Sequence, residues 1–265
     1  MKISLITMTR SFLRNTLKEG SYIEGKLIPF GRKTMSSLLD YSIFKQVLFP
    51  EVVTDESTSS DLSLRRSLSF SVSPKDAVKD MPWVVFDFET TGLNYHNDRI
   101  IEIGALKMIN GEIVDEISTL IEVDIPIPEV VQNITGITPD MLSGQPRIES
   151  YLSNFFKFIE GSILIAHNAE FDMSFLSAEA SRLGYDINWA CFCTLKMARD
   201  LLSELPKKNL DTLAEHYNLQ FEARHRSIGD AKVTVAVLNQ MLSDEGSHLK
   251  TWADFEPYQV THNIK

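Results

Sequence analysis

The sequence predicts an α/β fold built on a mixed sheet. Three apolar segments expected to form strands come first, shorter strands alternate with amphipathic helices after them, and helical segments follow. This order is typical of one sheet whose faces are covered by helices. A chain of 265 residues leaves room for one or two domains.

Strands are expected where apolar residues run together between turn signals. The pair Asn110-Gly111 is a strong signal for a two-residue hairpin turn between two such runs. Cys191 and Cys193 are expected on a further strand near Trp189. The runs themselves cover residues 83–89, 99–109, 112–123 and 162–166.

Helices are expected where apolar residues recur every three or four positions. The clearest case is residues 148–159, in which Leu152, Phe155 and Ile159 share a face. Gly184 is expected to end the helix predicted over residues 171–183, because glycine is common directly after a helix. The other expected helices are a short one at Thr138-Pro139 and longer ones over 171–183, 195–202, 210–217 and 231–241.

Composition divides the chain into four expected parts. Residues 1–50 form an N-terminal extension with a helix-like pattern over 35–49, and residues 51–80 form a Ser-rich linker. Residues 81–243 hold the α/β domain, and residues 244–265 are expected to be a C-terminal tail.

Targeting signals are weak. The first 18 residues lack the compact apolar stretch of a secretory signal, but their basic, Ser/Thr-containing composition leaves a transit peptide open. The apolar runs are far shorter than the ~20 residues of a membrane span. The expected location is therefore cytoplasmic, with no membrane partner.

Charge and cysteine content exclude several classes. The net charge is −10, and it is uneven: residues 1–80 carry +3 and residues 81–265 carry −13. Such an acidic domain does not bind nucleic acid through bulk positive charge. Cys191 and Cys193 are the two cysteines and are too close in sequence for an ordinary bridge, which excludes a disulfide framework.

Two acids stand at the end of the first expected strand. Side chains alternate along a strand, so Asp87 and Glu89 share one face with Val85. Two like charges beside a buried strand are costly unless a positive group lies between them, and a hard divalent cation would serve. The alternative is a frayed strand end in water.

Two more stretches join polar residues to helix starts. Asp172 follows His167-Asn168 in the first turn of an expected helix, where an acid is also common for purely structural reasons. Asp230 lies near the start of a later helix, five residues after His225. A histidine in that position can reach a metal site formed by the acid.

Taken together, these stretches resemble the DEDDh family of 3′–5′ exonucleases, typified by the proofreading subunit of bacterial replicative DNA polymerases. The first motif appears as Asp87-Phe88-Glu89-Thr90-Thr91-Gly92-Leu93 and the second as Ala166-His167-Asn168-Ala169-Glu170-Phe171-Asp172. The third appears as His225 with Asp230-Ala231. The resemblance covers about residues 82–242 and implies a ribonuclease H-like, five-stranded mixed sheet flanked by helices.

The resemblance also implies a mechanism. Asp87, Glu89, Asp172 and Asp230 would hold two divalent cations, Mg²⁺ or Mn²⁺, and His225 would accept a proton from the attacking water. The enzyme would release nucleoside 5′-monophosphates from DNA 3′ ends, in proofreading or repair.

Substrate contacts are expected around the first two motifs. Thr90 and Leu93 would lie against the terminal nucleotide, and Phe171 would form a pocket wall. For Gly92, a purely structural turn with positive φ is the alternative. His167 and Asn168 would either contact the edge of the site or support it through hydrogen bonds.

Three alternatives stay open. An RNA-trimming, oligoribonuclease-like enzyme of the same family would share the chemistry, because the site motifs do not read the 2′ position. A non-catalytic binding module would keep the fold and tether a partner through residues 1–80. An RNase H-like endonuclease would share the sheet and the carboxylates. A DNA polymerase subunit is an expected partner.

Overall fold

The computed structural model describes residues 66–260 and two short segments, 21–23 and 26–28. Residues 1–60 and 61–265 form separate units. In the first unit, strands β1 (Ser21–Ile23) and β2 (Lys26–Ile28) pair antiparallel. The helix expected over 35–49 and the possible transit peptide lie outside the described residues.

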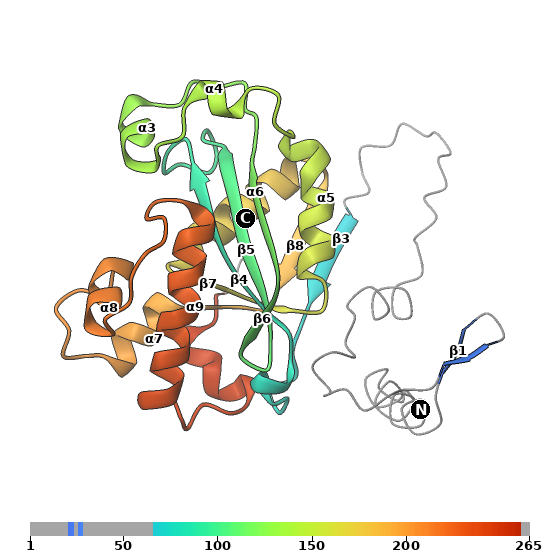
Figure 1. Ribbon diagram of the computed structural model, residues 1–265, viewed down its shortest axis with the longest axis vertical. Helices are drawn as coiled ribbons and strands as arrows, with labels where there is room; N and C mark the ends of the chain where they lie inside the picture. Colours follow the sequence, from blue (N-terminus) through green and yellow to red (C-terminus); the bar gives the residue numbers. More distant parts are fainter. Residues whose placement is uncertain (1–20, 24–25, 29–65, 261–265) are drawn as a thin grey trace. The chain divides into compact units, whose positions relative to one another are not determined.

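The second unit is built on a five-stranded mixed sheet, as the sequence predicts (Figure 1). Its strand order is β6-β5-β4-β7-β9. The first three strands are antiparallel neighbours, and β4, β7 and β9 run parallel. These strands are β4 (Trp83–Thr90), β5 (Ile100–Ile109), β6 (Glu112–Leu120), β7 (Ile163–Ala166) and β9 (Cys191–Cys193).

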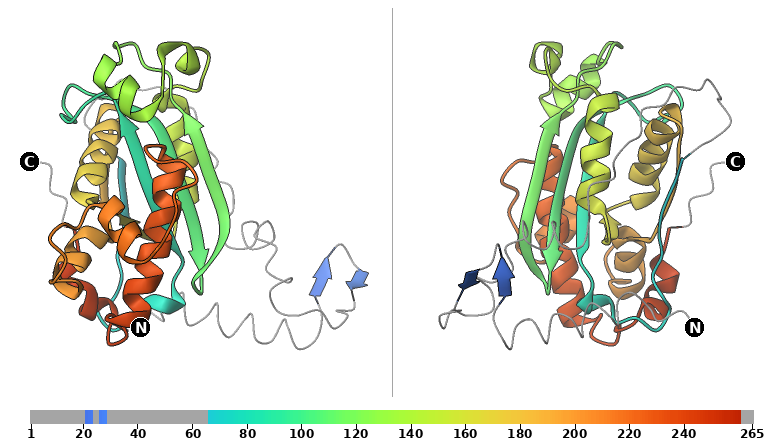
Figure 2. Two further views of the ribbon diagram at one scale, coloured as in Figure 1. Left: turned by 60° about the vertical axis from the view of Figure 1, so that its left-hand side comes forward. Right: turned by 90° about the vertical axis from the view of Figure 1, so that its right-hand side faces the viewer.

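Helices cover both faces of the sheet, with α9 on one face and α5 and α6 on the other (Figure 2). Alternation along β4 divides the core accordingly. Val85 packs in the cluster that contains α9 residues, whereas Val84 and Phe86 pack in the cluster of α5 and α6. The helices are α3 (Glu129–Thr135), α4 (Pro139–Leu142), α5 (Ile148–Ile159), α6 (Ala169–Arg182), α7 (Thr194–Leu201), α8 (Leu210–His216) and α9 (Ser227–Asp244).

The linker expected over residues 51–80 is corrected from residue 66 onward. Strand β3 (Arg66–Phe70) pairs in parallel with β8 (Tyr185–Trp189), and the Phe70 and Trp189 rings lie 5.7 Å apart. A 3-10 helix, η2 (Val78–Asp80), buries Val78. Leu68 and Phe70 alternate with serines, a strand period that the Ser-rich composition obscured.

The C-terminal tail expected over residues 244–265 is also corrected. Residues 252–258 form the 3-10 helix η3, which starts at a capping box between Thr251 and Asp254. Trp252, Phe255 and Tyr258 are buried, and the Phe255 ring lies 4.9 Å from Phe192. Their spacing of three residues matches the three-residue turn of a 3-10 helix, so one face packs against β9.

No helix of the described residues is both long enough and apolar enough to cross a membrane. The sequence prediction missed α3, which begins directly after Pro128. Proline at a helix start is favourable because its missing N–H costs no hydrogen bond there.

Candidate active site

Asp87 and Glu89 lie at the C-terminal end of β4, on the face of the sheet that α9 covers. Their position follows from alternation with Val85, which is buried against that helix layer. The two acids are partly exposed, whereas Phe88 between them is buried on the other face. The structure therefore places both carboxylates on one face at the end of β4.

Asp230 reaches the same edge from the first turn of α9. The helix approaches β5 closely at Gly104, where a Cβ would collide with the backbone of Ser227 and Ile228. Glu102, buried in β5, accepts a hydrogen bond from the Ser227 backbone N–H at 2.9 Å and forms an ion pair with Arg226 at 2.5 Å. The start of α9 is thus fixed to β5, which positions Asp230.

Carboxylate oxygens of Asp87, Glu89 and Asp230 all lie within 4.8 Å of one another. Asp172, in the first turn of α6, is buried beside them and accepts a hydrogen bond from the Phe88 backbone N–H at 3.2 Å. The structure therefore brings three of the four expected acids together and places the fourth against the strand that carries two of them.

Burial and crowding change how these acids titrate. Burial, followed by the charge of Asp172, raises the pKa of Asp87 well above its ordinary value. Burial and the charge of Asp230 raise the pKa of Glu89 to about 8. Burial also raises the pKa of Asp172 to about 7, against the hydrogen bond from Phe88. Burial raises the pKa of Asp230, while Arg224 opposes the shift.

This donor set fits a hard divalent cation. Its ligand atoms are carboxylate oxygens, which Mg²⁺ and Mn²⁺ prefer over softer donors. Oδ1 of Asp230 is buried and has no hydrogen-bond partner in the described part of the chain, and such an atom is rare in a folded protein unless something else satisfies it. The same ion would reduce the repulsion among the acids and would also satisfy this oxygen.

His225 lies directly before α9, beside Asp230. Its backbone adopts the left-handed conformation with φ of 59°, an uncommon state for a residue other than glycine. Nδ1 of its imidazole is 3.1 Å from the Nη1 atom of Arg224, which also bonds Asp230. Strained backbone of this kind is common at functional sites.

The loop after β4 is held by Asp98. Its carboxylate accepts hydrogen bonds from the Thr91 hydroxyl at 3.1 Å and from the Asn94 backbone N–H at 2.8 Å. A Cβ on residue 92 would collide with this carboxylate, and Gly92 does not have a positive φ. The positive-φ alternative is therefore wrong, and glycine is needed here for a close approach.

This loop presents Leu93 to solvent with 85% of its surface exposed, which suits a contact with a ligand. The Thr90 side chain is buried, and its hydroxyl donates to the Gly92 carbonyl at 2.6 Å. Thr90 thus shapes the loop that carries Leu93.

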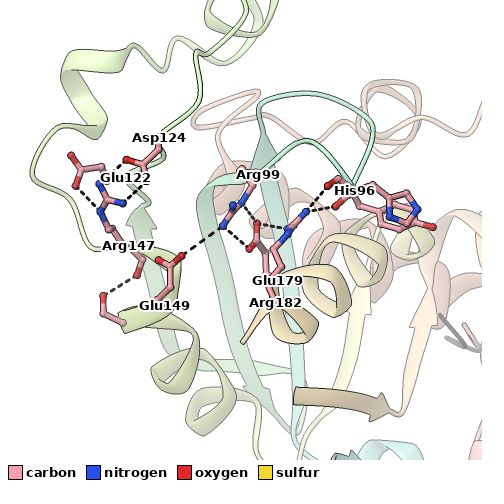
Figure 3. A network of polar contacts seen from close by, with 10 residues as sticks. His96, Arg99, Glu122, Asp124, Arg147, Glu149, Glu179 and Arg182 are labelled. Atoms are coloured by element: carbon pink, nitrogen blue, oxygen red, sulfur yellow. Dashed lines mark hydrogen bonds and ion pairs between the residues drawn. The ribbon is translucent and has the colours of Figure 1, made fainter. Parts of the chain in front are cut away.

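A polar network ties the same loop to α6 (Figure 3). Glu179 is buried and accepts two hydrogen bonds from Arg99, at 2.8 and 3.1 Å. It also pairs with Arg182 at 3.0 Å, and Arg182 donates to the backbone carbonyls of Tyr95 and His96. Helix α6 therefore fixes both Asp172 and the Leu93 loop.

The remaining expected residues differ in role. His167 bonds the Thr194 hydroxyl at 3.0 Å and the Lys208 carbonyl at 2.9 Å, and burial lowers its pKa to about 4. Because the imidazole of His167 is neutral and both of its nitrogens are already in hydrogen bonds, a supporting role is favoured over substrate contact. Asn168 is exposed with φ of 67° before α6, and Phe171 is half-buried with its ring 4.9 Å from that of Phe175.

Sequence reasoning missed Glu102, Glu179 and Arg224. Two of them carried a usable signal. Glu102 interrupts a buried strand, and Glu179 follows Asp172 by seven residues, two helical turns, which places both on one face of α6. Arg224 carried none, because the 221–226 segment lacks a regular pattern.

We predict that Gly104→Ala weakens cation binding about tenfold or more and lowers thermal stability. The added methyl group has to push the start of α9, and Asp230 with it, away from β5. Isothermal titration with Mn²⁺ and thermal unfolding measure the two effects. Gly111→Ala, in the open hairpin turn, is the control for Mn²⁺ affinity, since no described atom lies near its Cβ; its φ of 82° strains alanine, so it also shows how much a stability loss alone affects binding. Unchanged Mn²⁺ affinity in Gly104→Ala would contradict this account of how Asp230 is placed.

The raised pKa values predict that cation binding releases protons. Near pH 7, Glu89 and Asp172, whose pKa values are about 8 and about 7, are partly protonated, as is Asp87, whose pKa is also raised, so cation binding releases at least about one proton. The number of protons released falls as the pH is raised through about 8. Titration calorimetry with Mn²⁺ in two buffers of different ionisation enthalpy measures the number of protons.

The same shifts fix the sign of the pH dependence of stability without cations. Groups whose pKa is raised by folding stabilise the protein below their unfolded pKa of about 4, and this contribution is lost as the pH rises through about 7 and 8. In chelator, Glu89→Gln should lose less stability over this range than the unsubstituted protein. An equal or greater loss would contradict the shift at Glu89.

Comparison with known proteins gives the family. The RNase_T family model, described as Exonuclease, matches residues 84–238. The chain is 42% identical over 160 residues to the PolC-type DNA polymerase III of Caldanaerobacter subterraneus subsp. tengcongensis. That match covers 60% of this chain and 11% of the polymerase, so the chain spans about a tenth of that relative's length.

Solved structures agree with the fold. Exonuclease X, in complex with 5′-overhanging duplex DNA, shares 27% identity with a TM-score of 0.51 over 65% of this chain and 99% of its own. E. coli exonuclease I, in complex with a dT13 oligonucleotide, shares 16% identity with a TM-score of 0.57 over 64% of this chain and 42% of its own. The matched segment carries the grouped carboxylates, and the chain belongs to the RNase_T exonuclease family.

Proposed function

We propose that this protein is a metal-dependent 3′–5′ exonuclease that removes nucleoside 5′-monophosphates from DNA 3′ ends. The observation that carries the proposal is the group formed by Asp87, Glu89 and Asp230, whose carboxylate oxygens lie within 4.8 Å of one another beside His225. Membership of the exonuclease family and similarity to a PolC-type polymerase support it.

The four acids would hold two divalent cations, Mg²⁺ or Mn²⁺, with Asp172 completing the set from α6. When bound, such ions activate a water and stabilise the leaving oxygen of a phosphodiester. His225 would take the proton of the attacking water, because an imidazole can accept a proton near neutral pH. Leu93 and Phe171 would hold the terminal base, and Thr90 would shape the loop beside it.

DNA is the proposed substrate because the relatives point to it. The exonuclease X and exonuclease I structures contain DNA, and the 42% identical relative is a DNA polymerase. Association with a DNA polymerase is proposed on the same ground. The net charge of −13 over residues 81–265 implies weak affinity of this unit for a polyanion. The enzyme would therefore act distributively unless a partner or residues 1–80 add grip.

The test is a digestion panel with Mn²⁺, with Mg²⁺ and with chelator. We expect cation-dependent release of 5′-monophosphates from single-stranded DNA and from mispaired duplex 3′ ends, and no cleavage of circular DNA. Degradation of RNA oligomers alone would overturn the DNA assignment. Cleavage of circles would indicate an endonuclease, and inactivity on every 3′ end with either cation would indicate a binding module.

We predict that His225→Asn reduces turnover on the order of 10²-fold or more while Mn²⁺ affinity stays nearly unchanged. Asparagine tolerates the left-handed backbone of residue 225, so loss of the imidazole is the main change. His248→Asn, at an exposed position, is the matched control and should keep full turnover. Full turnover in His225→Asn would remove this residue from the mechanism.

A further inference from the structure

Arg224 connects three side chains at the edge of the site. Its Nε and Nη2 atoms donate to the two carboxylate oxygens of Asp211 at 2.6 and 3.0 Å. Its Nη1 atom donates to Oδ2 of Asp230 at 2.5 Å and lies 3.1 Å from Nδ1 of His225. One guanidinium therefore spans an acid of α8, an acid of the site and the neighbouring imidazole.

The chemistry of arginine fixes the direction of these contacts. A guanidinium has donors and no acceptor, so Nδ1 of His225 has to supply a lone pair to Arg224. The proton of a neutral imidazole is then on Nε2. In this arrangement neither ring nitrogen of His225 has a free lone pair, and Asp230 already has a positive partner.

Arg224 differs from the arginines that hold the fold together. Arg226 and Arg99 pair with Glu102 and Glu179, whose side chains are both 1% exposed. The other partner of Arg224, Asp211, is 54% exposed, so Arg224 is shared between a buried and an exposed carboxylate. The Arg224–Asp230 pair joins side chains that are 27% and 9% exposed, so water reaches the arginine, and the arginine can move away once a cation supplies the positive charge beside Asp230.

We propose that Arg224 is a positioning residue that acts as a movable counter-ion, shared between Asp211 and Asp230. A divalent cation bound at the free Oδ1 of Asp230 places a double positive charge beside the guanidinium on Oδ2 and repels it, and Asp211 retains the guanidinium through its two hydrogen bonds. The same movement frees Nδ1 of His225. Cation binding and the availability of the base are thereby coupled through one side chain. The inference rests on the proposed function, because it takes Asp230 as a cation ligand.

The test measures Mn²⁺ affinity by titration calorimetry in the full chain. Arg224→Gln should tighten binding about tenfold, since the competing charge is gone. Asp211→Asn should weaken it several-fold, since the displaced Arg224 has lost the partner that receives it. Arg147→Gln, which removes a similarly bidentate pair with Asp124 at an exposed position, is the matched control and should change nothing.

A double mutant separates this coupling from a general field effect. If Asp211 acts through Arg224, then Asp211→Asn has no effect on Mn²⁺ affinity in the Arg224→Gln background. If Asp211 only adds negative charge near the site, it weakens binding equally in both backgrounds, and the proposal is overturned. Equal affinity in all variants also overturns it.

The state of His225 gives a second readout, independent of turnover. In chelator, ¹⁵N NMR should show the His225 tautomer that is protonated on Nε2. Addition of Mg²⁺, used in place of Mn²⁺ because it is diamagnetic, should shift the Nδ1 resonance of His225. Arg224→Lys keeps the charge, but an ammonium group cannot bond Asp211, Asp230 and His225 at once as the planar guanidinium does. The Nδ1 resonance of His225 in this variant should therefore no longer respond to Mg²⁺. An Nδ1 resonance that is the same in all variants and insensitive to Mg²⁺ would overturn the proposal. Absence of any cation binding would instead overturn the proposed function, and this inference with it.

Discussion

Repulsion among buried carboxylates governs the construction of this protein. Asp87 and Glu89 come from the end of β4, Asp172 comes from α6 on one face of the sheet, and Asp230 comes from α9 on the other. Burial raises the pKa values of all four acids, and the charge of the other site acids adds to the shifts of Asp87 and Glu89, so keeping the four together has a free-energy cost. Much of the surrounding structure serves to hold them in place.

The supporting contacts are themselves charged, but they are arranged differently. Glu102 and Glu179 are buried, and each is matched by arginine at hydrogen-bonding distance. They fix the start of α9 and the Leu93 loop. Among the residues that the structure describes, the acids of the site have no such arginine partner apart from Arg224 on Asp230. The contrast between paired structural acids and crowded, poorly paired acids distinguishes the active site from its frame.

Local pattern was enough to predict the sheet and the placement of the main acids. Alternation along β4 put Asp87 and Glu89 on one face, and α5 was predicted with its bounds because its apolar residues follow the helical period. The four acids and His225 came from motif order. The arginines that neutralise the buried acids could not be predicted in this way, because Arg99 and Glu179, for example, are 80 residues apart and meet only in the folded protein. Residues 66–80 and 252–258 were missed because their short periods were hidden by serine and by loop-like composition.

The central claim is that the carboxylate cluster destabilises the protein until a cation binds it. The most direct measurement is thermal unfolding of the unsubstituted protein and of Asp87→Asn, each in chelator and in saturating Mn²⁺. In chelator, Asp87→Asn should unfold at a higher temperature than the unsubstituted protein, because asparagine avoids the cost that burial and neighbouring acids impose on the Asp87 carboxylate, and it should lose most of the stabilisation by Mn²⁺. A lower unfolding temperature in chelator, or an unchanged gain with Mn²⁺, would contradict the account.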